Sequence, residues 1–185
     1  MTARVGKLLV AHPNLPKDNW FYKTVIYIYS DNKEFGTLGI ALNVKTNLST
    51  KKLCYDRGIL YPYGDHLVSK GGPINPKSCI LLHTPEWQSQ NTISVGPRYS
   101  LSSDDQMFER ISIFDQPAYW RLFMGICGWG PGQLDMEIAG AFPYDKSNSW
   151  LLVNPSDDIV FNYDGDDQWV KAVDLCSQQT IDYFF

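Results

Sequence analysis

The chain has 185 residues, of which 44% are hydrophobic, 19% are charged and 14% are aromatic, and its formal net charge is −4. This composition is typical of a globular domain and excludes a disordered or low-complexity chain. No apolar run approaches the ~18 residues that a membrane helix needs, and the N-terminal segment lacks the apolar core of a secretion signal. We therefore expect a single domain over residues 1–185, located in the cytoplasm and with no membrane attachment.

The first half of the chain predicts strands separated by polar loops. Residues 24–30 and 37–44 are rich in β-branched and aromatic side chains, and the turn at 31–36 joins them into an antiparallel hairpin. Gly39 inside the second of these runs indicates a bulge or a close approach by another backbone. Residues 45–64 predict an irregular basic segment with one short helical turn. Further short strands are predicted at 5–11, 66–69, 79–83 and 93–95.

The second half alternates predicted helices and strands. Ser102 or Ser103 predicts the cap of a helix at 102–113, and Asp164 or Asp166 predicts the cap of a helix at 166–178. The remaining predicted elements are a helical remnant at 117–120, strands at 121–127, 150–153 and 159–163, and a helix at 131–141. A hairpin followed by alternating elements predicts an α+β domain, in which helices pack on a mixed sheet.

The stretch GWGPGQL at 128–134 is the most unusual loop of the sequence. Its glycines allow backbone angles closed to other residues, and its proline suits the first turn of the following helix. The N-terminus of that helix could hold an anion, but nearby carboxylates oppose a phosphate, and the nucleotide fingerprints are absent. The loop therefore predicts either a structural corner or a ligand or partner site, with the candidate residues Trp129, Gly130, Pro131, Gly132 and Gln133.

A second glycine–proline loop follows the predicted strand at 66–69. Gly71, Gly72 and Pro73 predict a tight turn beside the cation of Lys70. The same two interpretations stay open here, a turn or a binding site. A pocket lined by both loops would favour a nucleotide-binding protein or an unrecognised enzyme.

Charge is unevenly distributed along the chain. Residues 1–77 carry 11 Lys and Arg against 5 Asp and Glu, whereas residues 78–185 carry 5 against 15. Either the two halves pack together and offset each other, or the basic half binds nucleic acid, which the net charge does not support. The candidate residues for a nucleic-acid patch are Lys45, Lys51, Lys52, Arg57, Lys70 and Lys77.

The sequence contains no recognisable catalytic or metal-binding motif. Its four cysteines form no CxxC pair and predict buried free thiols, with Cys54 alone among them close to several basic residues. His12 and His83 each end an apolar run, which predicts hydrogen bonds at strand ends. HExxH, Cys/His clusters and GxSxG are absent. We therefore predict no catalytic residue, no metal site and no cofactor.

The order of several motifs resembles one known family. GKLLVAHPNL, WFYKTVIYIYSDN, GTLGIALN, KGGP, ILLHT and GICGWGPGQLDMEI follow one another over nearly the whole chain. Together they resemble the AlgH/YqgE family of bacterial proteins, which also occurs in plant plastids. The chain departs from the family pattern at Ile126, where the family tends to carry a second aromatic residue, and at Phe142, where it carries tryptophan.

The resemblance implies one α+β domain with a mixed, partly curled sheet flanked by helices. Some members have been labelled transcriptional regulators, but the resemblance implies no established activity or cofactor. We therefore predict a non-enzymatic regulatory or interaction protein, which acts through a protein partner near Trp129 and the 71–73 loop. The alternatives are a nucleic-acid-binding protein, and a nucleotide-binding protein or unrecognised enzyme with its site at the glycine–proline loops.

Overall fold

Nine strands form one continuous sheet in the computed structural model, which describes residues 4–141 and 149–184 of the chain. The strands are β1 (Leu8–Ala11), β2 (Val25–Asn32), β3 (Gly36–Ala41), β4 (Ser69–Lys70), β5 (Ile74–His83), β6 (Ile93–Ser94), β7 (Ser100–Ser102), β8 (Trp120–Trp129) and β9 (Trp150–Val153). The helices are α1 (Thr50–Tyr55), α2 (Gln106–Ser112), α3 (Gln133–Ala139), α4 (Asp157–Phe161) and α5 (Gly165–Phe184). Phe142 lies outside the described residues.

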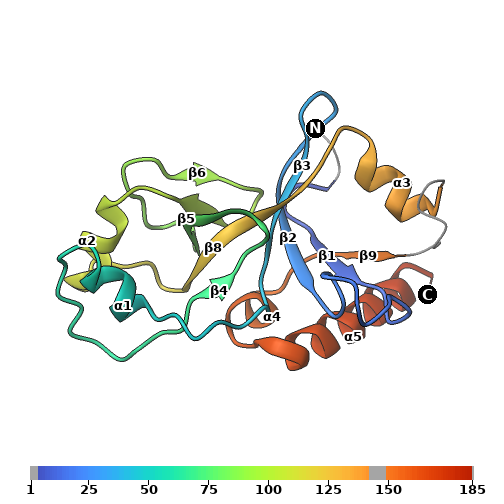
Figure 1. The fold of residues 1–185 in the computed structure, drawn as a ribbon. Helices are drawn as coiled ribbons and strands as arrows, with labels where there is room; N and C mark the ends of the chain where they lie inside the picture. The colour runs from blue at the N-terminus through green and yellow to red at the C-terminus, as the bar shows by residue number, and fades with distance from the viewer. Residues whose placement is uncertain (1–3, 142–148, 185) are drawn as a thin grey trace.

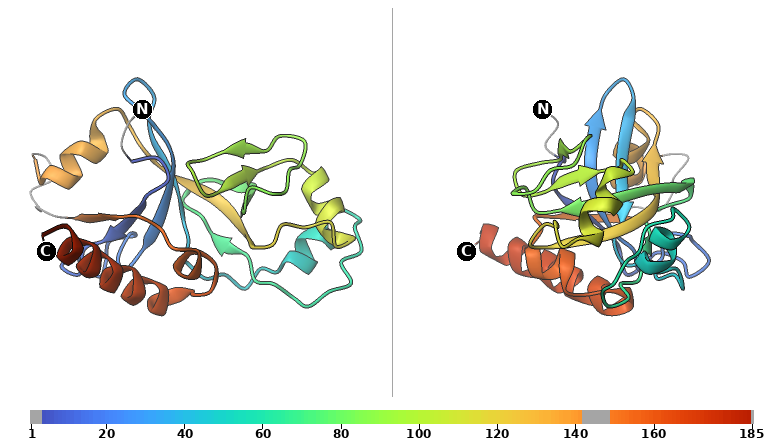
Figure 2. Two further views of the ribbon diagram at one scale, coloured as in Figure 1. Left: turned by 180° about the vertical axis from the view of Figure 1, so that it is seen from behind. Right: turned by 90° about the vertical axis from the view of Figure 1, so that its left-hand side faces the viewer.

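The sheet divides into two lobes that share β8 (Figure 1). The strand order is β6-β7-β5-β8-β3-β2-β1-β9, and β4 pairs with β8 beside this path. The first lobe contains β9, β1, β2, β3 and the second half of β8, with α5 packed along it. The second lobe contains β4 to β7 and the first half of β8, with α1 and α2 at its far end (Figure 2). The β4–β8 pair is parallel and the other pairs are antiparallel. The predicted α+β class with a mixed, curled sheet is therefore confirmed.

Glycines allow the backbones to approach closely where β8 changes partners. Gly125 has a φ of +76°, in the left-handed region that residues with a side chain rarely adopt. Gly71 and Gly72 cross the strand beside this point, and a Cβ on Gly72 would lie 2.0 Å from the carbonyl carbon of Ile126. These two glycines therefore form a strap against β8, where the chain passes from β4, parallel to β8, to β5, antiparallel to it.

The core follows the two lobes. Side chains of β1, β2 and β8, among them Leu8, Tyr27 and Phe123, pack with α4 and α5. In the second lobe, Leu81 of β5 packs with Phe108 of α2. These side chains are almost fully buried, and each contributes about 1.5–3 kcal/mol by leaving water. β8 contributes side chains to both clusters, with Phe123 in the first and Leu122 in the second.

Several predicted elements agree with the structure. The hairpin of β2 and β3 is present, and its register shifts between Ile28 and Ser30, opposite Gly39, as the glycine indicates. The short helical turn predicted within 45–64 is α1, and the strand predicted at 150–153 is β9. The strand predicted at 79–83 extends further, to become β5. No helix in the described part of the chain has the length and apolar character needed to cross a bilayer.

The prediction of a strand at 159–163 is wrong, because this segment belongs largely to the helix α4. Its β-branched and aromatic residues favour a strand. The hydroxyl of Ser156 accepts the N–H of Ile159 at 3.3 Å, however, and acidic Asp157 and Asp158 occupy the first turn. The Ser156 cap, and the attraction of the two carboxylates to the positive N-terminal end of the helix, together outweigh the strand propensity of these residues.

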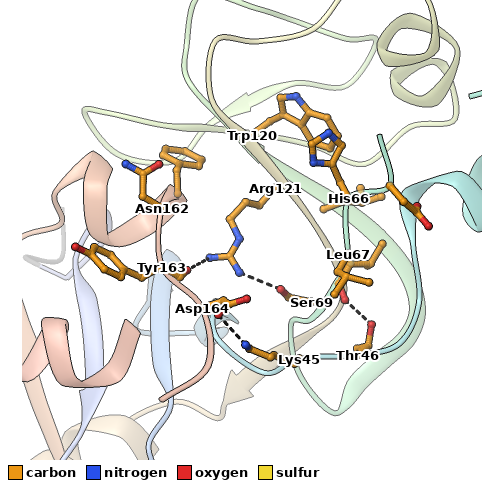
Figure 3. A pocket seen from close by; sticks show the side chains of 14 residues that line it. Lys45, Thr46, His66, Leu67, Ser69, Trp120, Arg121, Asn162, Tyr163 and Asp164 are labelled. Atoms are coloured by element: carbon orange, nitrogen blue, oxygen red, sulfur yellow. Dashed lines mark hydrogen bonds and ion pairs between the residues drawn. The ribbon is translucent and has the colours of Figure 1, made fainter. Parts of the chain in front are cut away.

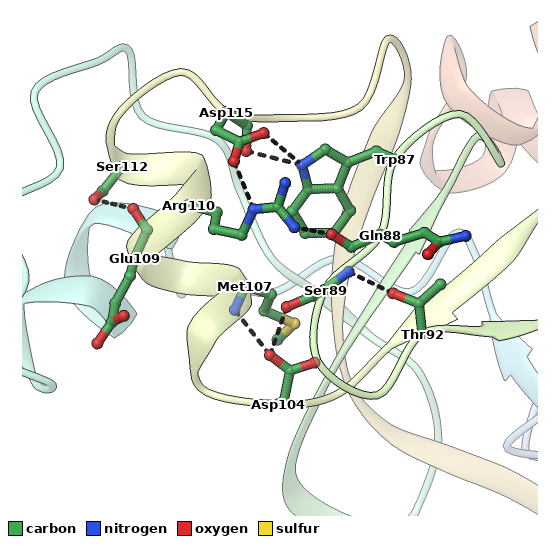
Figure 4. A network of polar contacts seen from close by, with 10 residues as sticks. All are labelled: Trp87, Gln88, Ser89, Thr92, Asp104, Met107, Glu109, Arg110, Ser112 and Asp115. Atoms are coloured by element: carbon green, nitrogen blue, oxygen red, sulfur yellow. Dashed lines mark hydrogen bonds and ion pairs between the residues drawn. The ribbon is translucent and has the colours of Figure 1, made fainter.

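The boundaries of other helices also differ from the predictions. Ser102 belongs to β7, and α2 starts only at Gln106. The carboxylate of Asp104 accepts the N–H of Met107 in the first turn of α2, at 3.1 Å (Figure 4). Residues 117–119 are not helical. The helix predicted at 131–141 is α3, which begins after Gly132 at a φ of +72°, so Pro131 precedes it.

Candidate functional site

The side chain of Trp129 in the GWGPGQL loop points into the core. It is 3% exposed, and its ring stacks on Phe21 with 5.7 Å between centroids. The indole N–H groups of Trp129 and Trp150 both donate to the same carboxylate oxygen of Glu137, at 3.0 and 2.9 Å. Trp129 is therefore an anchor that fixes the end of β8 to α3.

The polar groups of this loop largely satisfy one another. The side-chain amide of Gln133 donates to Glu137 at 2.9 Å, and its oxygen accepts the N–H of Gly130 at 3.0 Å. Gly130, Pro131 and Gly132 reach the surface. A ligand or partner would therefore meet the backbone of these three residues, and their role in binding stays a prediction.

The 71–73 loop lies further back along β8. The N–H of Gly71 donates to Met124 O at 2.7 Å, and its carbonyl accepts the N–H of Ala41 at 2.8 Å. Gly71 and Gly72 are buried, whereas Pro73 is exposed. Their backbone geometry is explained by packing, and a binding role of this loop also stays a prediction.

Most of the basic candidate residues have a partner. Lys45 pairs with Asp164 at 2.8 Å, and Lys52 pairs with Asp56. The guanidinium carbon of Arg57 lies 4.1 Å from the ring centroid of Phe108, and Arg57 also pairs with Asp105 at 3.4 Å. The ammonium nitrogen of Lys70 lies 5.6 Å from the ring centroid of Trp20. Lys51 lines a hollow in the second lobe. Because acidic partners offset part of this charge, it is weaker as a patch than the sequence count indicates, and nucleic-acid binding stays a prediction.

The nucleophilic side chains that the sequence singled out are buried. All four cysteines are buried free thiols, as predicted. Burial raises the pKa of the Cys127 thiol to about 12 and that of Cys176 to about 11, which leaves them protonated at neutral pH. His83 contacts the hydroxyl of Ser102 at 3.0 Å, but both residues have no exposed surface. Burial also lowers the pKa of His83, so this pair is a neutral part of the core.

A polar cavity lies between the two lobes (Figure 3). Its volume is about 380 Å³. Its walls come from the start of β8, from the segment that leads into β4, from the chain after β3 and from the connection between α4 and α5. The lining residues are Lys45, Thr46, Asp65, His66, Leu67, Val68, Ser69, Trp120, Arg121, Leu122, Phe161, Asn162, Tyr163 and Asp164.

Arg121 of β8 extends into the centre of this cavity (Figure 3). One terminal nitrogen donates to Leu42 O at 2.7 Å and to the hydroxyl of Ser69 at 3.0 Å. The other lies within 3.0 to 3.2 Å of three acceptors, which are Val160 O, Tyr163 O and the side-chain oxygen of Gln168. Burial lowers the pKa of Arg121 to about 10, and the charge of Asp164 opposes that shift. The guanidinium remains charged at neutral pH and links both lobes.

Aromatic and charged groups form the rim. The imidazole of His66 contacts the ring of Trp120 edge to face, with 5.3 Å between centroids. Lys45 and Asp164 pair with each other across another side of the opening. Lys45 is the one residue here that the sequence placed among its candidates. Arg121 was missed because it stands in an apolar strand, and the partners that surround it come from distant segments.

A second surface feature lies at the far end of the second lobe. We define the apolar face as Tyr55, Leu60, Tyr61, Tyr63 and Phe114. Tyr55 and Leu60 are 76% and 84% exposed and line a hollow of about 510 Å³ together with Tyr61. Tyr61 contacts Tyr63, which contacts Phe114 with 3.5 Å between ring centroids. Through the buried ring of Tyr61, these contacts link the hollow beside α1 to Phe114, which follows α2.

Comparison with known proteins identifies the family. A sequence model of the AlgH-like family matches residues 8–181. The chain belongs to the AlgH-like family. It is 30% identical over 169 residues to a UPF0301 protein of Hydrogenovibrio crunogenus, an alignment that covers 89% of this chain and 85% of the relative. It is also 30% identical over 169 residues to UPF0301 protein PM1869 of Pasteurella multocida, with coverages of 89% and 86%.

Two solved structures share the fold. The solution structure of AlgH from Pseudomonas aeruginosa has a TM-score of 0.74 and 23% sequence identity, and the match covers 92% of this chain and 87% of that one. The crystal structure of protein DIP2367 from Corynebacterium diphtheriae has a TM-score of 0.68 and 22% identity, with coverages of 91% and 85%. At this identity the likeness concerns the fold alone. The expected AlgH-like family membership is confirmed.

Proposed function

We propose that this protein is a non-enzymatic interaction protein, which exerts a regulatory role by binding a partner protein on the apolar face. The observation that carries the proposal is the exposure of large apolar side chains around one hollow, with Leu60 84% exposed. Contiguous apolar surface on a folded domain marks interaction sites, and tyrosine and phenylalanine are enriched in the centres of protein interfaces.

The backbone at Phe114 supports the same surface. Phe114 has a φ of +66°, where a bulky residue is strained by about 1–3 kcal/mol. Despite this strain Phe114 is 64% exposed, and its ring contacts that of Tyr63. Strained residues cluster at functional sites. Here the strained backbone holds the aromatic side chain of Phe114 at the surface, although a phenylalanine is usually buried.

Charge around the hollow indicates the chemistry of the partner. Lys51 lines the hollow, and Lys52 precedes Leu53 on the same short helix. Lys52 is neutralised by Asp56, whereas the described residues place no acidic group within ion-pair distance of Lys51. We therefore propose a partner segment with apolar anchors and a flanking acidic residue, which complements the cation of Lys51.

Site-specific photo-crosslinking in the source cells tests the proposal. A benzophenone amino acid is placed at Tyr55 or at Leu60, and at Phe35 as a control, since Phe35 is 76% exposed on the first lobe. We expect the same heterologous protein to be crosslinked from positions 55 and 60, none from position 35, and a clear loss of the adduct when Lys51→Glu is added.

Three results would contradict the proposal. They are equal crosslinking from all three positions, an adduct with the mass of two copies of this chain, and an adduct that Lys51→Glu leaves unchanged. Far-ultraviolet circular dichroism and thermal unfolding of each variant check that the chain is folded, so that a lost adduct reports on the surface.

A further inference from the structure

We propose that the cavity between the lobes binds a small organic acid, whose carboxylate accepts the Nε–H of Arg121 while its ring lies against Trp120. This ligand site is separate from the apolar face and goes beyond the proposed binding of a partner protein. It takes in residues of both lobes, namely Arg121 and Trp120 from β8 and Phe161 from α4.

The hydrogen bonds of Arg121 leave one donor free. All the hydrogen bonds of its guanidinium within the described part of the chain are made by the two terminal nitrogens. Every fully buried side-chain nitrogen or oxygen among the described residues has a partner. The Nε–H, which has none, therefore retains accessible surface, and the space beside it is the cavity that Arg121 lines. The terminal contacts hold this donor in a fixed orientation.

The partners of Arg121 are neutral, which favours an anion. Its five hydrogen-bond acceptors are carbonyl groups, a side-chain amide and a hydroxyl. Asp164 acts on it through space, but that carboxylate is paired with Lys45 at 2.8 Å. Burying a charge without a paired opposite charge is costly, and a ligand carboxylate on Nε would form the charge-assisted hydrogen bond that is missing.

The size and lining of the cavity define the class of acid. A volume of about 380 Å³ lies at the small end of the range for ligand pockets. Trp120, Phe161 and Leu122 offer apolar surface for a ring. Asp65 and Asp164 also line the cavity, and they oppose a second negative charge. These features together select a monocarboxylate with a planar ring over a phosphate dianion.

Nuclear magnetic resonance of the full chain tests the site without altering it. Indole-3-acetate is the probe, and indole-3-acetamide is its uncharged match. We expect the acid to shift the side-chain Nε–H resonance of Arg121 and the indole resonance of Trp120. Because a charge-assisted hydrogen bond is involved, we expect binding about tenfold or more tighter than for the amide.

Variants separate this site from the apolar face. Arg121→Lys keeps the charge but removes the Nε–H, and it should weaken binding of the acid about tenfold or more. Leu60→Ser, on the apolar face, should bind the acid as the unaltered chain does, so that each proposal can fail alone.

Two results on the unaltered chain would overturn the proposal, whatever the stability of Arg121→Lys. One is equal binding of acid and amide. The other is the absence of any shift at Arg121 with millimolar acid.

Discussion

At the scale of single residues, Glu137 is the clearest example of a side chain whose role depends on its surroundings. Both of its carboxylate oxygens are used, one by two indole N–H groups and the other by the amide of Gln133. These bonds join the end of β8, the start of α3 and β9. The GWGPGQL sequence is therefore explained to a large extent as the corner that makes this junction.

Replacing this carboxylate tests the junction. In Glu137→Gln, one oxygen becomes an NH₂ group that faces donors, so at least one N–H is left without an acceptor. We expect a loss of about 1–3 kcal/mol in the free energy of unfolding, measured by urea denaturation with tryptophan fluorescence. Glu109→Gln on the exposed side of α2 is the matched control and should change stability by less than about 0.5 kcal/mol. Equal effects of the two variants would contradict the assigned role.

Gly72 provides a second prediction at this scale. A methyl group there would overlap the backbone of β8, 2.0 Å from the carbonyl carbon of Ile126. Gly72→Ala should therefore destabilise the fold by about 3 kcal/mol or more. Gly64→Ala, where a Cβ would have no neighbour within 4 Å, should be close to neutral or slightly stabilising. Thermal unfolding of the two variants measures both effects. An unchanged unfolding temperature for Gly72→Ala would contradict the prediction and show that the strap can move away from β8.

At the scale of elements, the start of α2 shows how a carboxylate replaces the predicted serine cap. Burial disfavours the charged form of Asp104, but hydrogen bonds from Ser89 and Met107 (Figure 4) and from Asn91 outweigh this effect and lower the pKa of its carboxyl. Folding therefore favours the ionised form. Its stabilising effect is fully present above the ordinary aspartate pKa of about 3.9 and is lost as the pH falls through the lowered value.

A variant at this cap should show that pH dependence. Asp104→Asn should cost about 1 kcal/mol of stability at neutral pH, and the difference from the unaltered chain should shrink as the pH is lowered below about 4. Asp105→Asn is the control, because the Asp105 side chain makes no cap hydrogen bond. Denaturation in urea at the two pH values measures both, and a cost for Asp104→Asn that is independent of pH would contradict the role of its charge.

The elements also show how far the sequence could be interpreted. The hairpin of β2 and β3, the short helix α1 and the α+β class were predictable, because side-chain periodicity and turn residues act locally. The helix α4 was missed because its cap at Ser156 was outweighed by a run of β-branched and aromatic residues. The cavity was not predictable, since Leu42, Ser69 and Gln168 meet Arg121 only through the pairing of distant segments.

At the scale of the whole molecule, β8 belongs to both lobes. Its first half pairs with β5 and β4, and its second half pairs with β3. Neither lobe can be removed without taking part of the other's sheet. The two ends of the molecule, with the apolar face at one and the GWGPGQL corner in the other, are consequently parts of one folding unit.

The shared strand has a consequence for how the protein opens. A region unfolds by itself only if its hydrogen bonds can break without exposing the core elsewhere. Separation of β8 from either set of neighbours would uncover Phe123 in the common core, so partial opening costs nearly as much as complete unfolding. Slow amide exchange should therefore extend along β8 through both lobes, and we expect the chain to unfold as a single cooperative unit despite its two-lobed outline.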